Sequence, residues 1–184
     1  MSQVRVARLT TPVSDRDHTI GPANAPITLL EYGDYECPYC GRAFPIVQEV
    51  RRRLGDYLRF VFRNFPLTQI HAHAEHAAEV AEAAAAQEQF WPMHDWLFRH
   101  QFALDDDALL EGARELGLDV ERLRRELADA THRARVRGDF ASGIRSGVNG
   151  TPTFYINGER HDADYEIGTL MAAIEHARLA ESRR

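Results

Sequence analysis

The sequence contains no lysine, and its 22 basic residues are all arginine. This absence excludes mechanisms that require a lysine, such as a Schiff base or a Walker-type phosphate loop. Cysteine is nearly absent, with two residues in 184, which excludes the disulfide framework of small secreted proteins. No segment approaches the ~18 consecutive apolar residues of a membrane-spanning helix, so we expect no membrane span.

Length, charge and composition set further bounds. The 184 residues suffice for one domain with a sizeable core, or for a domain that carries an insertion. The net charge of -6 argues against a nucleic-acid partner. The first 20 residues contain no apolar run of signal-peptide length. We therefore expect a cytoplasmic protein, or an exported one if a leader was removed.

Both cysteines lie in the motif Cys37-Pro38-Tyr39-Cys40, which follows a short apolar run over residues 27–32. That run is typical of a buried strand. Proline suits the first turn of a helix, where its missing N–H costs nothing. Apolar residues then recur at helical spacing until Gly55, a fitting end to a helix. The pattern predicts a strand, the cysteine motif and a helix over residues 38–54.

A cysteine at a helix start has distinct chemistry. Unpaired backbone N–H groups and the positive end of the helix dipole both favour the thiolate. We therefore expect the pKa of Cys37 to lie below the ~8.5 of a free thiol. Cys40 lies one turn further in and is expected to be more shielded. Cys37 would form a mixed disulfide with a substrate, and Cys40 would resolve it.

Two other interpretations of the cysteine pair remain open. A structural zinc site needs about four ligands, and the chain has no second C-x-x-C motif. Histidines would have to supply the rest. His71, His73 and His76 are a separate candidate metal cluster, with surface histidines near a helix start as the alternative. The second alternative is a buried, inert pair. The position beside polar residues at a helix start favours a redox pair, which needs neither a metal nor an organic cofactor.

Two further segments are candidates for the site. Glu31 ends the apolar run, where burial would raise its pKa and let it exchange a proton with Cys40; a solvated acid is the alternative. Thr151-Pro152 precedes an expected strand. Cis X–Pro bonds are only ~5–6% of the total. If this bond is cis, the Thr151 backbone could pair with an extended substrate segment as an added strand.

The remaining elements follow from periodicity and turn residues. Residues 1–20 alternate weakly, at Val4, Val6 and Leu9, and favour a short edge strand. Residues 68–147 are helical throughout, with aspartates as helix caps and a break at Phe90-Trp91-Pro92. The expected elements are a strand at 58–62; helices at 71–89, from 93, from 105 to 117, from 119 to 129 and at 131–146; strands at 153–156 and 159–161; and a helix at 167–180.

Taken together, Glu31, the cysteine motif and the segment Gly150–Gly158 resemble the DsbA-like thiol–disulfide oxidoreductases of the thioredoxin superfamily. The resemblance covers about residues 20–180. It implies an α/β, thioredoxin-like fold with an inserted helical subdomain. The halves of that fold would be residues 20–67 and 148–182, and the insertion would be residues 68–147.

The resemblance also implies roles for single residues. Cys37 and Cys40 match the nucleophilic and resolving cysteines, and Glu31 matches the buried acid before the motif. Pro152 matches the cis-proline opposite the disulfide, and Thr151 the residue before it. We expect substrates to contact these two residues and also Pro38 and Tyr39. Tyr39 stands where the best-known oxidant of the family carries histidine, so we expect a potential in the reducing half of the family range.

The sequence therefore predicts a thiol–disulfide oxidoreductase that exchanges disulfides with protein or small-thiol substrates. Its partners would be thiol- or disulfide-containing proteins, glutathione, or an electron-donating or electron-accepting redox protein. One rival is a glutathione-linked, glutaredoxin-like reductase, because C-P-Y-C also occurs in glutaredoxins, although those are compact and lack the insertion. The other rival is a non-catalytic, peptide-binding thioredoxin-fold module.

Overall fold

The structure, a computed structural model, describes residues 7–181, and its internal contacts divide the chain into two units. Unit 1 contains the described residues up to Tyr32, then Arg42–Arg63 and the described residues from Ser142 onward. Unit 2 contains Gly33–Gly41 and Asn64–Ala141. Within residues 7–181, no helix combines the length and the apolar character that crossing a membrane requires.

Unit 1 is built on a five-stranded sheet with the order β1-β3-β2-β4-β5. Strand β1 runs antiparallel to β3, and β4 runs antiparallel to both β2 and β5. The strands expected at 27–32, 58–62, 153–156 and 159–161 are confirmed. An edge strand, β1, forms at the end of the range 1–20 and does not include Leu9, whereas Val4 and Val6 lie outside the described residues. The bounds are β1 His18–Ile20, β2 Ile27–Gly33, β3 Leu58–Asn64, β4 Thr153–Ile156 and β5 Glu159–His161.

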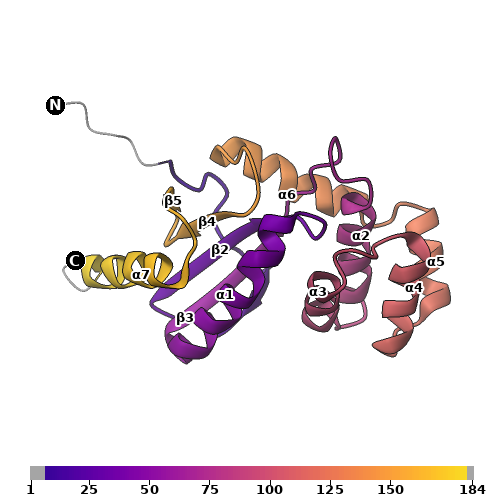
Figure 1. Cartoon of the computed structure of the whole chain (residues 1–184), viewed down its shortest axis with the longest axis horizontal. Coiled ribbons are helices and arrows are strands. Elements are labelled where there is room, and N and C mark those ends of the chain that lie inside the picture. The colour runs from indigo at the N-terminus through magenta and orange to yellow at the C-terminus, as the bar shows by residue number, and fades with distance from the viewer. Residues whose placement is uncertain (1–6, 182–184) are drawn as a thin grey trace. The chain divides into compact units, whose positions relative to one another are not determined.

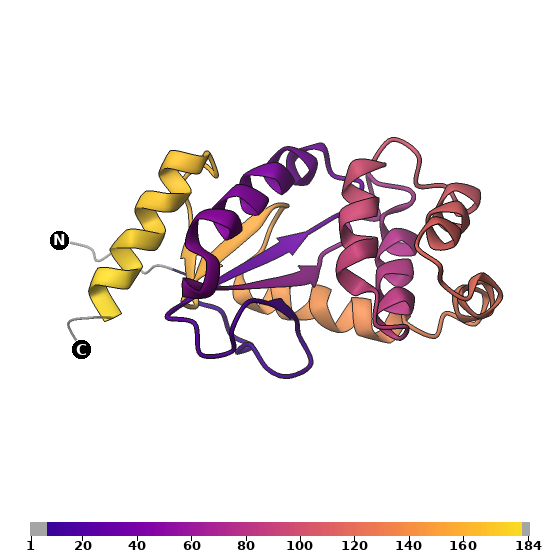
Figure 2. The same ribbon diagram turned by 90° about the horizontal axis from the view of Figure 1, so that it is seen from below.

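Helices cover this sheet. The helix α1 (Pro38–Leu54) has the predicted bounds, and its part in unit 1 buries Val47 and Val50. The last turn of α6 (Arg133–Ser146) lies on the other side of the strands from α1 (Figure 2). There the Tyr32 hydroxyl and Ser142 Oγ are hydrogen-bonded at 2.8 Å. The final helix, α7 (Ile167–Glu181), packs against β4 (Figure 1).

Unit 2 consists mainly of helices, namely α2 (Ala74–Ala85), α3 (Phe90–Arg99), α4 (Asp106–Glu115), α5 (Val120–Ala128) and most of α6. Alanine-rich α2 packs against α3, α4 and α5 (Figure 1), because its small side chains permit close approach. Asp105 and Asp119 cap α4 and α5 by accepting hydrogen bonds from Ala108 N and Arg122 N, as the sequence predicts.

The prediction of a break at Phe90-Trp91-Pro92 is wrong, because α3 begins at Phe90. Pro92 lies in the first turn of that helix, where its missing N–H has no intrahelical acceptor to lose. The helix expected from His71 begins instead at Ala74. His71 and His73 precede it and pair with carboxylates of the segment before the cysteines.

Candidate active site

The two cysteines lie together at the beginning of α1. Cys37 directly precedes the helix and Cys40 lies in its first turn, and both are present as thiols 4 Å apart. Their exposed fractions are 2% and 0%, so the expected difference in shielding is small. The first turn of α1 carries no acidic residue. The positive end of the helix dipole therefore acts on the sulfur atoms without a competing negative charge from that turn.

Backbone hydrogen bonds fix the segment that leads into the motif. Cys37 N donates to Asp34 O over 3.2 Å, and Gly41 N donates to Cys37 O over 3.1 Å. Asp34 N donates to Cys40 Sγ over 3.5 Å. This last bond gives the Cys40 sulfur a donor that stabilises negative charge on it.

The carboxylate of Asp34 fixes this segment through hydrogen bonds. Its side chain is completely buried. Oδ1 accepts from Glu36 N over 2.8 Å, a local Asx-type turn. Oδ2 accepts from Leu67 N over 2.8 Å and pairs with His71 Nδ1 over 2.7 Å. Asp34 therefore joins the residues before Cys37 to the segment after β3.

Gln101 approaches the motif from the segment that follows α3. Its Nε2 donates to two carbonyl oxygens, those of Tyr35 and Cys37, over 2.8 Å each. Sequence reasoning missed Gln101 and Asp34. The turn-forming character of an aspartate after a strand could have pointed to Asp34. Nothing local in the sequence marks Gln101, because its partners lie more than 60 residues away.

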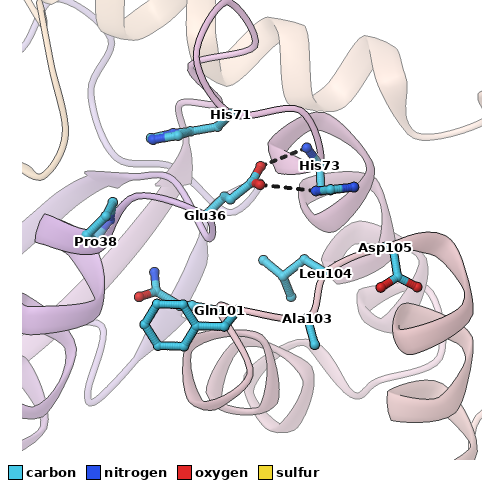
Figure 3. A pocket seen from close by; sticks show the side chains of 9 residues that line it. Glu36, Pro38, His71, His73, Gln101, Ala103, Leu104 and Asp105 are labelled. Carbon is cyan, nitrogen blue, oxygen red and sulfur yellow. Dashed lines mark hydrogen bonds and ion pairs between the residues drawn. The ribbon is translucent and has the colours of Figure 1, made fainter.

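A cavity of about 340 Å³ opens beside Pro38 in unit 2 (Figure 3). Glu36 occupies one side, where its carboxylate accepts from His73 N over 2.7 Å and pairs with His73 Nδ1 over 3.1 Å. Phe102 is 99% exposed at this site, and the cavity combines such apolar surface with acidic groups. The lining residues are Glu36, Pro38, His71, His73, Gln101, Phe102, Ala103, Leu104 and Asp105.

The histidines considered as metal ligands each pair with a different carboxylate. His71 pairs with Asp34, His73 with Glu36 and His76 with Asp106. Among residues 7–181, no three His, Cys, Asp or Glu side chains are grouped so that they could hold a metal ion. The residues described thus offer the cysteine pair no zinc site.

The predicted site residues outside the cysteine motif belong to unit 1, so the candidates fall into two groups. Glu31 lies in β2 opposite Phe154 of β4 and is 2% exposed. The Thr151–Pro152 peptide bond, just before β4, is cis, the isomer that the resemblance implies. In unit 2, Pro38 lines the cavity and Tyr39 is 56% exposed.

Several curated relatives are sodium–proton antiporters. The Na(+)/H(+) antiporter NhaA 3 of Salinispora tropica is 49% identical over 172 residues, which are 92% of this chain and 26% of the antiporter. The NhaA of Herminiimonas arsenicoxydans is 43% identical over 162 residues, 88% of this chain and 26% of that protein. The chain therefore spans about a quarter of the length of these relatives.

Solved structures share the fold. A thioredoxin-like oxidoreductase from Silicibacter pomeroyi superposes with a TM-score of 0.80 at 29% identity, over 90% of this chain and 94% of that one. BdbD from Bacillus subtilis gives a TM-score of 0.80 at 24% identity, over 94% and 97% of the two chains. Wolbachia pipientis alpha-DsbA1 gives 0.78 at 21%, over 92% and 94%.

A family model described as thioredoxin matches residues 13–176, most of the chain. The match includes the cysteine motif, β2 and the cis Thr151–Pro152 bond. The chain belongs to the thioredoxin family, and its mixed α/β fold is that of the DsbA-like structures.

Proposed function

We propose that this protein is a thiol–disulfide oxidoreductase whose nucleophile is Cys37. One observation carries the proposal: two thiols lie 4 Å apart at the N-terminal end of α1. A thiol at a helix N-terminus is a stronger acid than a free thiol, and the thiolate is the attacking species in disulfide exchange. The resemblance to a thioredoxin-like oxidoreductase at 29% identity supports the same chemistry.

The exchange proceeds in two balanced steps. The Cys37 thiolate attacks one sulfur of a substrate disulfide, so that a Cys37–substrate disulfide forms and one substrate thiolate leaves. The Cys40 thiolate then attacks the Cys37 sulfur, which closes the Cys37–Cys40 disulfide and releases the second substrate thiolate. Two electrons pass from the cysteine pair to the substrate, and the two cysteine protons end on the substrate thiols. The reverse sequence oxidises a substrate dithiol.

Two unit 1 features have roles in this proposal. Glu31, buried in β2, is the proposed proton partner of Cys40. The backbone of Thr151, before the cis-proline, is the proposed edge on which an extended substrate segment adds as a strand. The substrates are proteins with thiols or disulfides, and Pro38 and exposed Tyr39 would contact them.

We propose that the pair lies in the reducing half of the range from ~-270 to ~-120 mV spanned by C-x-x-C proteins. The support is Tyr39, an uncharged residue within the motif that supplies no cation to stabilise the thiolate. A reducing pair suits a compartment that keeps thiols reduced, such as the cytoplasm.

A redox titration tests the proposal. The protein is equilibrated in glutathione buffers of graded potential, alkylated and weighed by mass spectrometry. We expect one two-electron transition that is lost in Cys37→Ser and in Cys40→Ser. The absence of any titratable disulfide would overturn the enzyme proposal, and a midpoint near -120 mV would overturn the reducing assignment. Reduction of insulin disulfides, compared with turnover of a glutathione mixed disulfide, separates protein substrates from a glutaredoxin-like activity.

The antiporter relatives suggest a partner. Each contains a segment similar to nearly the whole of this chain within one longer protein. We propose that this chain acts on an Na(+)/H(+) antiporter by thiol–disulfide exchange with cysteines of the antiporter. Cys40→Ser, which retains the mixed disulfide, should capture the antiporter in a complex that dithiothreitol releases. Cys37→Ser is the matched control, and equal recovery with both variants would contradict a covalent contact.

A further inference from the structure

The side chain of Gln101 contacts the backbone of Tyr35 and of Cys37, the two residues that flank Glu36. Its Nε2 donates to Tyr35 O and to Cys37 O over 2.8 Å each. Cys37 O also accepts from Gly41 N over 3.1 Å. The carbonyl oxygen of the nucleophilic residue therefore receives two hydrogen bonds, one from its own helix and one from a side chain in the segment after α3.

Gly41 provides an independent sign that this contact is close. A Cβ atom built on Gly41 would lie 1.9 Å from Gln101 Oε1 and 2.6 Å from its Cδ. Glycine inside a helix costs about 1 kcal/mol relative to alanine. Its presence in the first turn of α1 leaves the space that the Gln101 amide occupies.

We propose that Gln101 is a positioning residue that holds the Tyr35–Cys37 backbone and stabilises the thiolate of Cys37. The amide N–H group is the positive end of a dipole, and it offsets the partial negative charge on two carbonyl oxygens near the nucleophile. Without it, those oxygens oppose the negative charge that Cys37 acquires. The inference rests on the proposed exchange reaction and assigns a further residue to the same site.

Gln101→Leu tests the role, because leucine keeps much of the side-chain volume and removes the donor. The readouts are the rate of iodoacetamide alkylation of Cys37 against pH, in a Cys40→Ser background, and the equilibrium of the intact pair with glutathione. A hydrogen bond contributes about 0.5–1.5 kcal/mol, and 1.4 kcal/mol is a factor of ten. We expect the rate of alkylation at pH 6 to fall by about two- to tenfold. The equilibrium constant of the intact pair with glutathione should shift toward the Cys37–Cys40 disulfide by a similar factor.

Two glycine variants provide a second test. Gly41→Ala should displace the Gln101 amide and change both readouts in the same direction. Gly138→Ala, in α6, is the control, because its added Cβ would meet no atom within 4 Å. A purely structural role would lower the melting temperature of Gln101→Leu and leave the pH profile of alkylation unchanged.

The outcomes separate this inference from the function on which it rests. If the unaltered protein forms no exchangeable disulfide with glutathione, the proposed function is wrong. If it does and folded Gln101→Leu matches it in both readouts, the positioning role is wrong. If Gln101→Leu does not fold, Gly41→Ala decides: a slower alkylation supports the role, and an unchanged rate overturns it.

Discussion

Arg63 forms a buried, two-point ion pair with Asp17 inside unit 1. Arg63 Nε and Nη2 donate to Asp17 Oδ1 and Oδ2 over 2.7 and 3.0 Å, and the side chains are 3% and 4% exposed. Burial alone would lower the pKa of Arg63, but hydrogen bonds to Asp17 and Tyr32 raise it above its ordinary value. Arg63 also donates to the carbonyls of Thr11 and Pro12, so the pair joins the N-terminal segment to β3.

Asp17→Asn should therefore destabilise the protein strongly. Asparagine keeps the shape of the side chain but leaves the buried charge of Arg63 without its counter-charge. Breaking a buried pair in this way costs about 3–5 kcal/mol. The free energy of unfolding from urea titration measures the loss. Asp15→Asn, at an exposed position, is the control and should change it by less than about 0.5 kcal/mol; equal values for the two variants would contradict the prediction.

Asp34→Ala should loosen the segment before the cysteines. The change removes the acceptor for Glu36 N, Leu67 N and His71 Nδ1. Hydrogen bonds to charged groups contribute about 1.5–3 kcal/mol each, so we expect a loss of about 3 kcal/mol in unfolding free energy. Native-state alkylation of Cys40 should also accelerate, because a loosened segment uncovers a sulfur that is otherwise 0% exposed.

Asp164 offers a matched control for that prediction. Asp164 Oδ1 accepts from Glu166 N over 3.1 Å in the same local arrangement, but at the surface. Asp164→Ala should cost less than about 1 kcal/mol and leave alkylation of Cys40 unchanged. A comparable loss in both variants would show that the turn, rather than the buried network, accounts for the effect.

The sequence predicts the elements whose signals are local. Asn157-Gly158 between two strand-like runs predicts β4 and β5, and Pro38 and Gly55 predict the bounds of α1. Asp105 and Asp119 likewise mark helix starts. Each of these residues acts on backbone within a few positions, which is why pattern reasoning finds it.

The features that the sequence does not reveal depend on distant contacts. Gln101 bonds carbonyls more than 60 residues away. Arg133 and Arg135 pair with buried Glu79 and Asp139. Phe90 starts a helix where Pro92 suggested a break. Charge and residue type are visible in a sequence, but the carboxylate or carbonyl that a side chain meets depends on packing between elements.

Tyr155 should make stability fall at alkaline pH. Burial raises the pKa of its phenol above the ordinary value of about 10, and its hydroxyl donates to Ser146 O over 2.7 Å. Because the folded state holds this proton more tightly than the unfolded state, the stabilisation is complete below the unfolded pKa. This stabilisation is lost as the pH rises from the unfolded-state pKa of about 10 through the higher pKa of the folded state.

Urea titrations between pH 8 and 11 measure that dependence. The unaltered protein should lose stability above pH 10 more steeply than Tyr155→Phe, which carries no titrating hydroxyl. Tyr57→Phe, at an exposed tyrosine, is the control and should keep the dependence of the unaltered protein. Parallel curves for all three proteins would contradict the assignment to Tyr155.

Cys40→Ser should convert transient exchange into a stable covalent complex. Cys37 can still attack a substrate disulfide, but the sulfur that would release the substrate is missing, so the mixed disulfide persists. Incubation with a peptide disulfide should give one adduct on Cys37, resolved by mass spectrometry and removed by dithiothreitol. Cys37→Ser keeps only Cys40, which lies inside the first turn of α1 and not at its N-terminal end, and should form the adduct at least tenfold more slowly. If Cys37→Ser instead reacts faster than Cys40→Ser, the nucleophile is Cys40 and the roles of the two cysteines are reversed.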